Sequence, residues 1–180
     1  MHATLADVIA DTTQNSIEAG AKNVSLDIVE DGTMIYVTIK DDGKGMDEAT
    51  LKRAFNPFYT EPGKHDKRKV GLGLPILKQI CESTDGGVTL ESQKGVGTTL
   101  KYSFSAKHID LPPMGELANA ILMLFNYPGE FELVFTHKTP AGEYSISRSD
   151  LSDAVGGLES VEGISLAREF LSSQEEALRE

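Results

Sequence analysis

The chain has 180 residues, with 17 Lys and Arg against 28 Asp and Glu, so its formal net charge is −11. A single cysteine excludes an internal disulfide framework and a cysteine-rich zinc site. No apolar run nears the ~20 residues that span a bilayer, and the acidic balance argues against binding to a nucleic-acid backbone. We therefore expect a cytoplasmic protein with neither a membrane nor a nucleic-acid partner. One segment departs from this balance: residues 64–69, Lys-His-Asp-Lys-Arg-Lys, form a basic island.

The first 110 residues are predicted to alternate helices with β-hairpins. Apolar residues at spacings of three and four predict a helix over 4–19. Alternation of apolar and polar residues predicts strands near 24–28 and 35–39, turned at Asp31-Gly32. Further along, we expect a helix over 47–55, a loop over 56–73, a helix over 75–83 with Pro75 in its first position, and a hairpin formed by 88–90 and 100–104.

Composition shifts at Leu111-Pro112-Pro113, where we place a domain boundary between a core domain, 1–110, and a C-terminal extension, 111–180. The extension has no catalytic signature, and His137 is expected to be structural or solvated rather than a ligand. We expect an apolar helix over 114–126, strands over 131–137 and 143–147, and helices over 149–155 and 164–178.

The opening helix places Asp7, Asp11, Asn15 and Glu18 on one face, at spacings of four, four and three residues. Asp and Asn are unfavourable inside a helix by roughly half a kcal/mol each relative to Ala. The face is either a solvated polar surface or a set of hard oxygen donors suited to Mg²⁺ and phosphate. The helix by itself leaves both interpretations open.

Two glycine-containing turns follow in the chain. In the first, Asp41-Asp42-Gly43-Lys44-Gly45, the leading aspartate could accept a hydrogen bond from a ligand amine. Gly43 and Gly45 permit positive φ and a close approach of the backbone. The second, at 95–99, reads Gly-Val-Gly-Thr-Thr between two predicted strands. Each motif, taken alone, is also compatible with an ordinary turn.

A third glycine motif, Gly71-Leu72-Gly73-Leu74, links the basic island to a predicted helix. A glycine-rich turn at a helix N-terminus offers free N–H groups and a positive dipole end to an anion. The cations of 64–69 would add donors for phosphate oxygens. The alternative is a solvated loop, and the position of the island beside this turn favours phosphate binding.

The order of these motifs resembles the GHKL family of ATP-binding domains, which includes sensor histidine kinases, MutL, gyrase and the large heat-shock chaperone. Residues 15–19, Asn-Ser-Ile-Glu-Ala, resemble the family's N box, and 41–46 resemble its first glycine box. Phe55-Asn56-Pro57-Phe58 resembles the F box of the kinase members. The remaining glycine boxes match residues 71–73 and 95–97.

The resemblance spans residues 5–105 and implies a Bergerat-type α/β (α+β) two-layer sandwich: a mixed, mostly antiparallel sheet covered on one face by helices. It also implies that ATP and Mg²⁺ bind between the helices and a lid formed by 59–70. In the family, the matching residues have defined roles: Asn15 would coordinate Mg²⁺ and phosphate, Asp41 would accept from the adenine amino group, and Thr98 would support that contact through water. The other residues implied to bind the nucleotide are Glu18, Gly43, Gly45, Met46, Phe58, Lys64, Lys67, Arg68, Lys69, Gly71, Leu72, Gly73 and Leu74.

Three departures from the family's pattern bear on the reaction. Hydrolysing members carry a glutamate base four residues before the N-box asparagine, where this chain has Asp11, which is one methylene shorter. Asp11 is therefore either a base or a Mg²⁺ ligand. Glu18 stands where kinases usually carry lysine, and it is more like the acidic residue of MutL and gyrase. No phosphoacceptor histidine box is found and little chain precedes residue 5, so we expect the acceptor on another protein.

We therefore expect a stand-alone protein kinase or ATPase subunit that binds Mg-ATP and phosphorylates or regulates an unidentified partner protein. Two alternatives stay open. One is an ATP-driven clamp or hydrolase in the manner of MutL, which Glu18 and Asp11 would favour. The other is a non-catalytic nucleotide sensor that is read out through residues 111–180.

Overall fold

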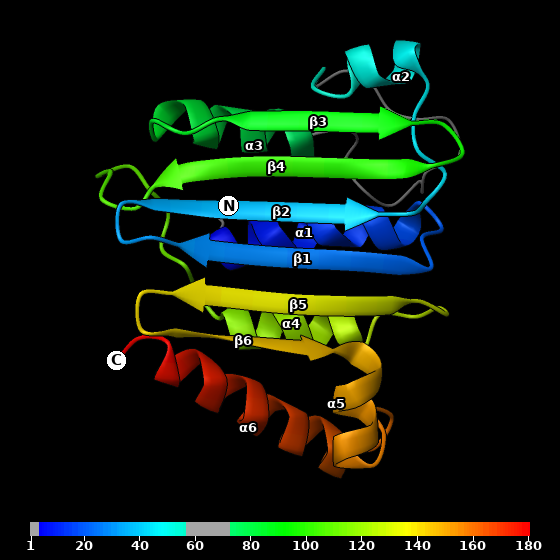
Figure 1. Ribbon diagram of the computed structural model, residues 1–180, viewed down its shortest axis with the longest axis vertical. Coiled ribbons are helices and arrows are strands. Elements are labelled where there is room, and N and C mark those ends of the chain that lie inside the picture. Colours follow the sequence, from blue (N-terminus) through cyan, green and yellow to red (C-terminus); the bar gives the residue numbers. More distant parts are fainter. Residues whose placement is uncertain (1–3, 57–72) are drawn as a thin grey trace.

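A six-stranded sheet backed by helices makes up the computed structural model, which describes residues 4–56 and 73–180 (Figure 1). The strand order is β3-β4-β2-β1-β5-β6, and α1, α3 and α4 lie behind the sheet in this view. The strands are β1 (Asn23–Glu30), β2 (Met34–Asp41), β3 (Val88–Gln93), β4 (Gly97–Ser105), β5 (Glu132–Thr139) and β6 (Gly142–Ser147). The helices are α1 (Leu5–Glu18), α2 (Glu48–Arg53), α3 (Gly73–Ser83), α4 (Leu117–Phe125), α5 (Arg148–Val155) and α6 (Val161–Ala177).

Antiparallel pairing dominates the sheet, and the pairing of β1 with β5 makes it mixed. The pairs β1–β2, β2–β4, β3–β4 and β5–β6 are antiparallel, whereas β1 and β5 are parallel. Alternation along each strand sets the two faces. In β2, Ile35, Val37 and Ile39 are buried against the helices, while Tyr36 and Lys40 are exposed on the open face. The fold class expected from the sequence is confirmed.

Helix α1 is fixed at its N-terminus by its own cap and by the segment that precedes α4. The hydroxyl of Thr4 accepts a hydrogen bond from the Asp7 amide at 3.2 Å, and the Asp7 carboxylate accepts one from the Thr4 amide at 2.8 Å. This capping box satisfies two free amides. The amides of Leu5 and Ala6 donate to the backbone carbonyls of 113–114 at 2.9 and 2.8 Å. Residues beyond the predicted domain boundary thus complete the start of the first helix.

The C-terminal extension continues the sheet and shares its core. β5 lies parallel to β1, with Leu133 opposite Val24. Helix α4 packs beside α1 behind the sheet (Figure 1), and Ile121 of α4 belongs to the same buried cluster as Ile9 of α1. The division at residue 110 stays a prediction; strands from both sides of it pair within one sheet.

Helix α3 begins at Gly73, so Pro75 occupies its third position. The prediction that Pro75 is the first residue of the helix is therefore wrong. The third position still lies in the first turn, where the missing N–H of proline costs no hydrogen bond within the helix. Cys81 is buried in α3, and burial raises the pKa of its thiol to about 11, so it is a packing residue. Among the helices of 4–56 and 73–180, none is long and apolar enough to cross a bilayer.

A buried hydrogen-bond network ties β1 and β5 to α6. His137 is 3 % exposed and contacts a carboxylate at each ring nitrogen: Nδ1 lies 2.9 Å from Glu175 and Nε2 lies 2.8 Å from Glu30. The hydroxyl of Tyr144 also donates to Glu175. Burial alone would lower the pKa of His137, but the hydrogen bonds to Glu175 and Glu30 outweigh it and raise the pKa to about 9. His137 is thus a buried structural residue.

We expect the free energy of unfolding to fall as the pH rises through about 9, because the protonated ring of His137 holds both carboxylates. The pKa in the folded state lies above the ~6.5 of an unfolded histidine, so this stabilisation is complete below about pH 6.5. At ~1.4 kcal/mol per pKa unit, it amounts to roughly 3–4 kcal/mol at most. Denaturant titrations across this pH range measure it. His137→Gln should lose the pH dependence, and His108→Gln, at a partly exposed histidine, should keep it. Identical profiles for wild type and His137→Gln would contradict this assignment.

Candidate functional site

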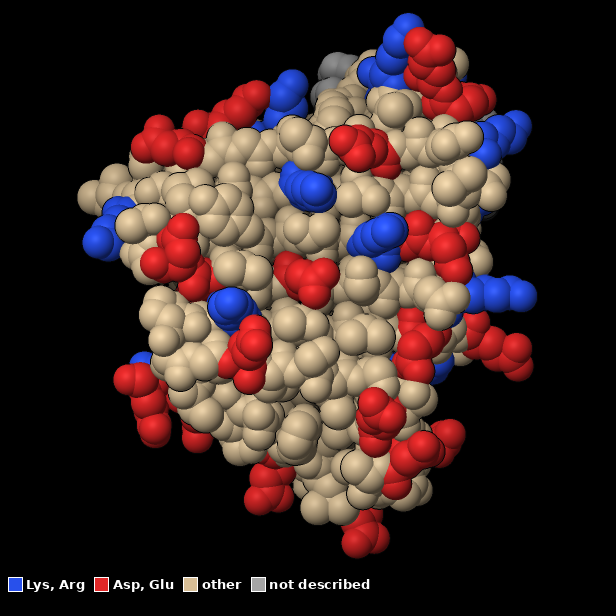
Figure 2. Space-filling model, in the orientation of Figure 1, with Lys and Arg blue, Asp and Glu red and all other residues tan. Residues whose placement is uncertain are grey.

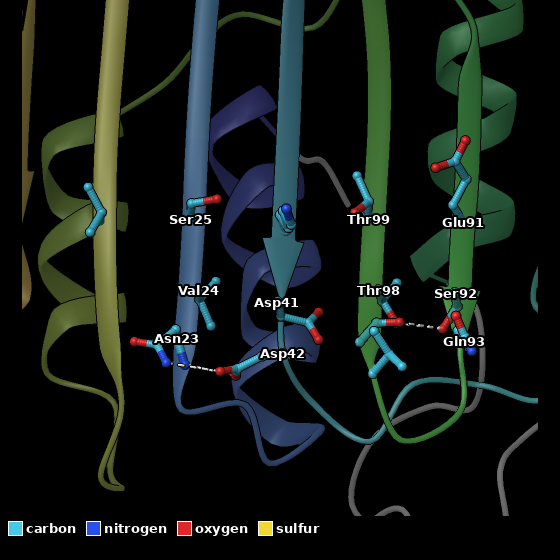
Figure 3. A pocket seen from close by; sticks show the side chains of 14 residues that line it. Asn23, Val24, Ser25, Asp41, Asp42, Glu91, Ser92, Gln93, Thr98 and Thr99 are labelled. Atoms are coloured by element: carbon cyan, nitrogen blue, oxygen red, sulfur yellow. Dashed lines mark hydrogen bonds between the residues drawn. The ribbon is translucent and has the colours of Figure 1, made fainter.

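Asp41 is a buried carboxylate at the end of β2. It continues the alternating set of residues that face the helices, and it is 7 % exposed. Its Oδ1 accepts a hydrogen bond from the Gly43 amide at 2.9 Å, which helps to turn the chain after the strand. Helix α1 passes behind this end of the sheet (Figure 3). A carboxylate in such a water-poor setting makes a strong hydrogen bond to a ligand amine.

Two glycines allow the backbone to close around Asp41. Gly97 has φ +146°, and a Cβ built on it would lie 2.0 Å from the Asp41 carbonyl oxygen. Gly45 has φ +64°, and its Cβ would lie 2.0 Å from the Gln93 carbonyl oxygen. A side chain at Gly45 would push the loop after β2 away from β3, and one at Gly97 would push β4 away from the end of β2. The close approach that the sequence predicted is therefore present at this edge of the sheet.

The loop 42–46 is held between α1 and the β3–β4 turn. The Lys44 amide donates to the carbonyl of Ala19 at 3.0 Å, and the Gly95 amide donates to the carbonyl of Lys44 at 2.7 Å. Gly43 does not have the positive φ that its sequence permits. A Cβ built on it would nevertheless lie only 2.9 Å from the carbonyl oxygen of Ala19, so the backbone approaches α1 closely here. The loop therefore connects the end of α1 to the strand that carries Asp41.

Ser92 of β3 joins three segments of the site, and the sequence analysis missed it. Its Oγ accepts a hydrogen bond from the Met46 amide at 2.8 Å and donates to the Gly97 carbonyl at 3.1 Å. It also lies 2.8 Å from the hydroxyl of Thr98, which is opposite Asp41 on β4 (Figure 3). A serine inside a strand carries no signal of this role, because the role depends on the pairing of β3 with β4.

Asp42 is a second residue that sequence reasoning did not single out. Its carboxylate accepts from the amides of Lys22 and Asn23 at 2.8 and 2.9 Å and from the Asn23 side chain at 2.9 Å (Figure 3). These hydrogen bonds hold the pKa of Asp42 below its usual range, and the one from the Asn23 side chain has the largest effect. Asp42 therefore fixes the start of β1 beside the end of β2, which separates its role from that of Asp41.

The polar face of α1 contains side chains in different settings. Asp7 is part of the N-terminal cap, Asp11 is exposed, and Asn15 is half-buried. Glu18 is half-buried and accepts a hydrogen bond from the hydroxyl of Tyr127 at 2.8 Å. The amide oxygen of Asn15 and the carboxylate of Asp11 are the kind of donors that Mg²⁺ prefers. Their coordination of a metal stays a prediction.

Several expected nucleotide-binding residues lie outside the described residues. They are Phe58, Lys64, Lys67, Arg68, Lys69, Gly71 and Leu72, together with the expected lid over 59–70. At the adjoining start of α3, Gly73 is exposed and Leu74 packs half-buried against the core. Within 4–56 and 73–180, no three His, Cys, Asp or Glu side chains are arranged to hold a metal ion.

A depression of about 540 Å³ lies over the same end of the strands on the helix-free face. Its lining includes Ser25 and Thr99 together with Asp41, Ser92 and Thr98 (Figure 3). Figure 2 shows this face of the molecule, where Lys and Arg are interspersed with Asp and Glu. Such a mixed polar surface is typical of the solvated face of an antiparallel sheet. The depression thus shares residues with the candidate site, although the side chain of Asp41 lies on the helix side of the sheet.

A family model described as "Histidine kinase-, DNA gyrase B-, and HSP90-like ATPase" matches residues 2–109. The chain belongs to this ATPase family. The matched part is an ATP-binding domain of the histidine kinase type, as the motifs around Asn15, Asp41 and Gly97 predicted. The roles of single residues within it stay predictions.

Sensor histidine kinases are among the relatives of this ATPase-family member. The sensor histidine kinase WalK of Bacillus subtilis is 30% identical over 106 residues, which are 57% of this chain and 17% of WalK. The heme sensor protein HssS of Staphylococcus saprophyticus is 36% identical over 104 residues, which are 58% of this chain and 22% of HssS. The chain thus spans about a fifth of the length of these relatives.

A solved structure extends the likeness of fold beyond the matched family region. The crystal structure of the N-terminal domain of a DNA repair protein superimposes with a TM-score of 0.59 at 17% identity. The superposition covers 89% of this chain and 58% of the chain in that crystal structure. The fold of this ATPase-family member, with part of its C-terminal extension, is therefore shared with that domain.

We expect Gly97→Ala to lower the free energy of unfolding by roughly 2–4 kcal/mol, because backbone strain and overpacking add at this position. Gly95→Ala is the matched control: it lies in the same turn with φ +79°, but nothing lies within 4 Å of its Cβ. We expect it to cost about 1 kcal/mol, from conformation alone. Denaturant unfolding measures both variants, and equal losses would show that the approach of Gly97 to Asp41 is not required.

Proposed function

We propose that the chain binds Mg-ATP and acts as a stand-alone protein kinase or ATPase subunit that phosphorylates or regulates a separate partner protein. The observation that carries the proposal is the buried carboxylate of Asp41 in a member of this ATPase family. A carboxylate accepts a hydrogen bond from the exocyclic amine of adenine, and it repels the carbonyl oxygen that guanine has at that position. The proposal is therefore specific for adenine nucleotides.

The surrounding residues support defined roles for each part of the nucleotide. Thr98, placed by Ser92, would support the adenine contact beside Asp41. Asn15 and Asp11 would supply oxygen ligands to Mg²⁺ from α1. When bound, Mg-ATP supplies the γ-phosphoryl group. The chain's own contribution to transfer is positioning and charge neutralisation, for which the basic residues of 64–69 would provide cations.

The setting of the described histidines supports an acceptor on another protein. Both ring nitrogens of His137 are hydrogen-bonded to buried or half-buried carboxylates, so neither nitrogen is available for phosphorylation. Nδ1 of His108 accepts from the Asp110 amide at 3.1 Å, and its Nε2 lies 3.8 Å from Asp85. A histidine or serine of a partner protein is therefore proposed as the acceptor.

An ATP-driven clamp or hydrolase is the second candidate function. The likeness of fold to the N-terminal domain of a DNA repair protein favours it, because that likeness reaches past residue 110. Asp11, four residues before Asn15, would then be the base that activates water. This candidate requires steady release of phosphate and ATP-dependent dimerisation, whereas the kinase requires a labelled protein.

Asp41→Asn tests the nucleotide site. We expect it to weaken ATP binding by about tenfold or more, because a hydrogen bond to a charged acceptor is worth ~1.5–3 kcal/mol. The amide oxygen of asparagine can still accept from Gly43, so the turn is kept. Calorimetry with ATP, ADP and GTP, with and without Mg²⁺, measures the effect. Asp27→Asn, on the open face of β1, is the control and should bind as wild type does. Equal affinities of the wild type for ATP and GTP would contradict the adenine assignment.

Asn15→Asp tests phosphoryl transfer. The added negative charge beside Mg²⁺ and phosphate should abolish transfer of label from [γ-³²P]ATP to a discrete protein in a lysate of the source organism. Asn119→Asp, which makes the same change on α4 and can still accept from Arg168, should leave labelling intact. Labelling that persists with Asn15→Asp would sink the kinase proposal. Steady phosphate release without a labelled protein would favour the hydrolase.

A further inference from the structure

Tyr127 comes from outside the region that matches the family model, yet it contacts the helix that carries Asn15. Its hydroxyl donates to Glu18 Oε1 at 2.8 Å. The side-chain amide of Gln14 donates to the same carboxylate oxygen at 2.8 Å and to the hydroxyl of Tyr127 at 3.2 Å. The three half-buried side chains therefore form a closed triangle on α1, next to Asn15.

The position of Tyr127 is fixed by an arginine that acts on its backbone. Arg148, the first residue of α5, donates to the carbonyls of Phe125, Gly129 and Phe131 at 2.7, 3.2 and 2.8 Å, and to that of Tyr127 at 3.2 Å. Its guanidinium also lies 4.0 Å from the centroid of the Phe131 ring. The turn between α4 and β5 is thereby held in one conformation, from which Tyr127 extends to α1.

Helix α1 is thus held at both ends by residues of the extension. Its first two amides donate to the carbonyls of 113–114, and the carboxylate of Glu18 in its last turn accepts from Tyr127. Asp11, Asn15 and Glu18 share one face at spacings of four and three, so a rotation of the helix would move all three together. The contact with Tyr127 opposes such a rotation and restrains the carboxylate of Glu18.

We infer that Tyr127 is a positioning residue for the phosphate and metal end of the nucleotide site. This inference rests on the proposed function. Glu18 lies one turn from Asn15, where an unrestrained carboxylate would compete with phosphate oxygens for the metal and repel them. By restraining Glu18, Tyr127 sets how strongly binding of ATP depends on Mg²⁺. We expect the adenine end, around Asp41, to be less sensitive to this contact, because the loop 42–46 is joined to α1 through the backbone carbonyl of Ala19.

Calorimetry on the full chain tests the inference with Tyr127→Phe, which removes the hydroxyl and keeps the ring. We expect the affinity for ATP to fall by about threefold or more, which lies within the usual range of coupling energies between contacting residues. Half-maximal binding of ATP should also require a higher concentration of Mg²⁺. Adenosine affinity should be unchanged. Tyr36→Phe, at an exposed tyrosine on the open sheet face, is the matched control and should bind both ligands as wild type does.

A double-mutant cycle separates this role from a general loss of structure. In the Glu18→Gln background the charge is absent, so adding Tyr127→Phe should no longer change ATP affinity or its Mg²⁺ dependence. Equal weakening of ATP and adenosine by Tyr127→Phe, or no change in either, would overturn the inference while leaving the proposed function standing. Failure of the wild type to bind ATP at all would overturn both.

Discussion

Strand β1 is hydrogen-bonded along both edges, and the rest of the structure depends on that double pairing. Its antiparallel partner β2 carries Asp41 to one end of the sheet, and its parallel partner β5 brings in the C-terminal extension. Because β4 and β5 then run in the same direction with two strands between them, α4 must cross behind the sheet. This crossover places α4 beside α1 and allows residues 113–127 to contact both ends of that helix. The pairing of β1 with β5 therefore determines that α4 lies beside α1, the helix whose polar face is proposed to bind Mg²⁺ and phosphate.

The candidate site combines one buried charge with a tightly closed backbone. A carboxylate at 7 % exposure is costly to bury, and the hydrogen bond from Gly43 offsets part of that cost. The absence of side chains at Gly45 and Gly97 lets the loop, β3 and β4 meet around Asp41, and Ser92 joins them by hydrogen bonds. Such a closely packed backbone would suit the proposed recognition of a flat base by few polar contacts. The proposed phosphate end would be organised differently, since it would draw on the exposed and half-buried face of a single helix.

Much of the fold could be predicted because its signals are local. The alternation of Ile35, Val37 and Ile39, the spacing of Leu5, Val8 and Ile9, and the turn glycines each depend on neighbours in the chain. Asp41, Gly45 and Gly97 could be singled out as candidates because their motifs occur in a set order. The parallel pairing of β1 with β5 could not be predicted, because no local pattern indicates which strands pair with each other. Ser92 and Tyr127 were missed for the same reason: each acts through a residue that is distant in sequence.

The same long separation between β1 and β5 bears on the order of folding. The β1–β2 hairpin closes over a short turn at Gly32, so its contacts cost little chain entropy. The pairing of Val24 with Leu133 joins the first third of the chain to the last, and it can form only after that long loop has closed. Until then, β1 presents an unpaired edge of alternating apolar residues, and α1 has two free amides at its start. Synthesis of the extension thus ends a period in which the nascent ATP-binding domain is open to pairing with other chains.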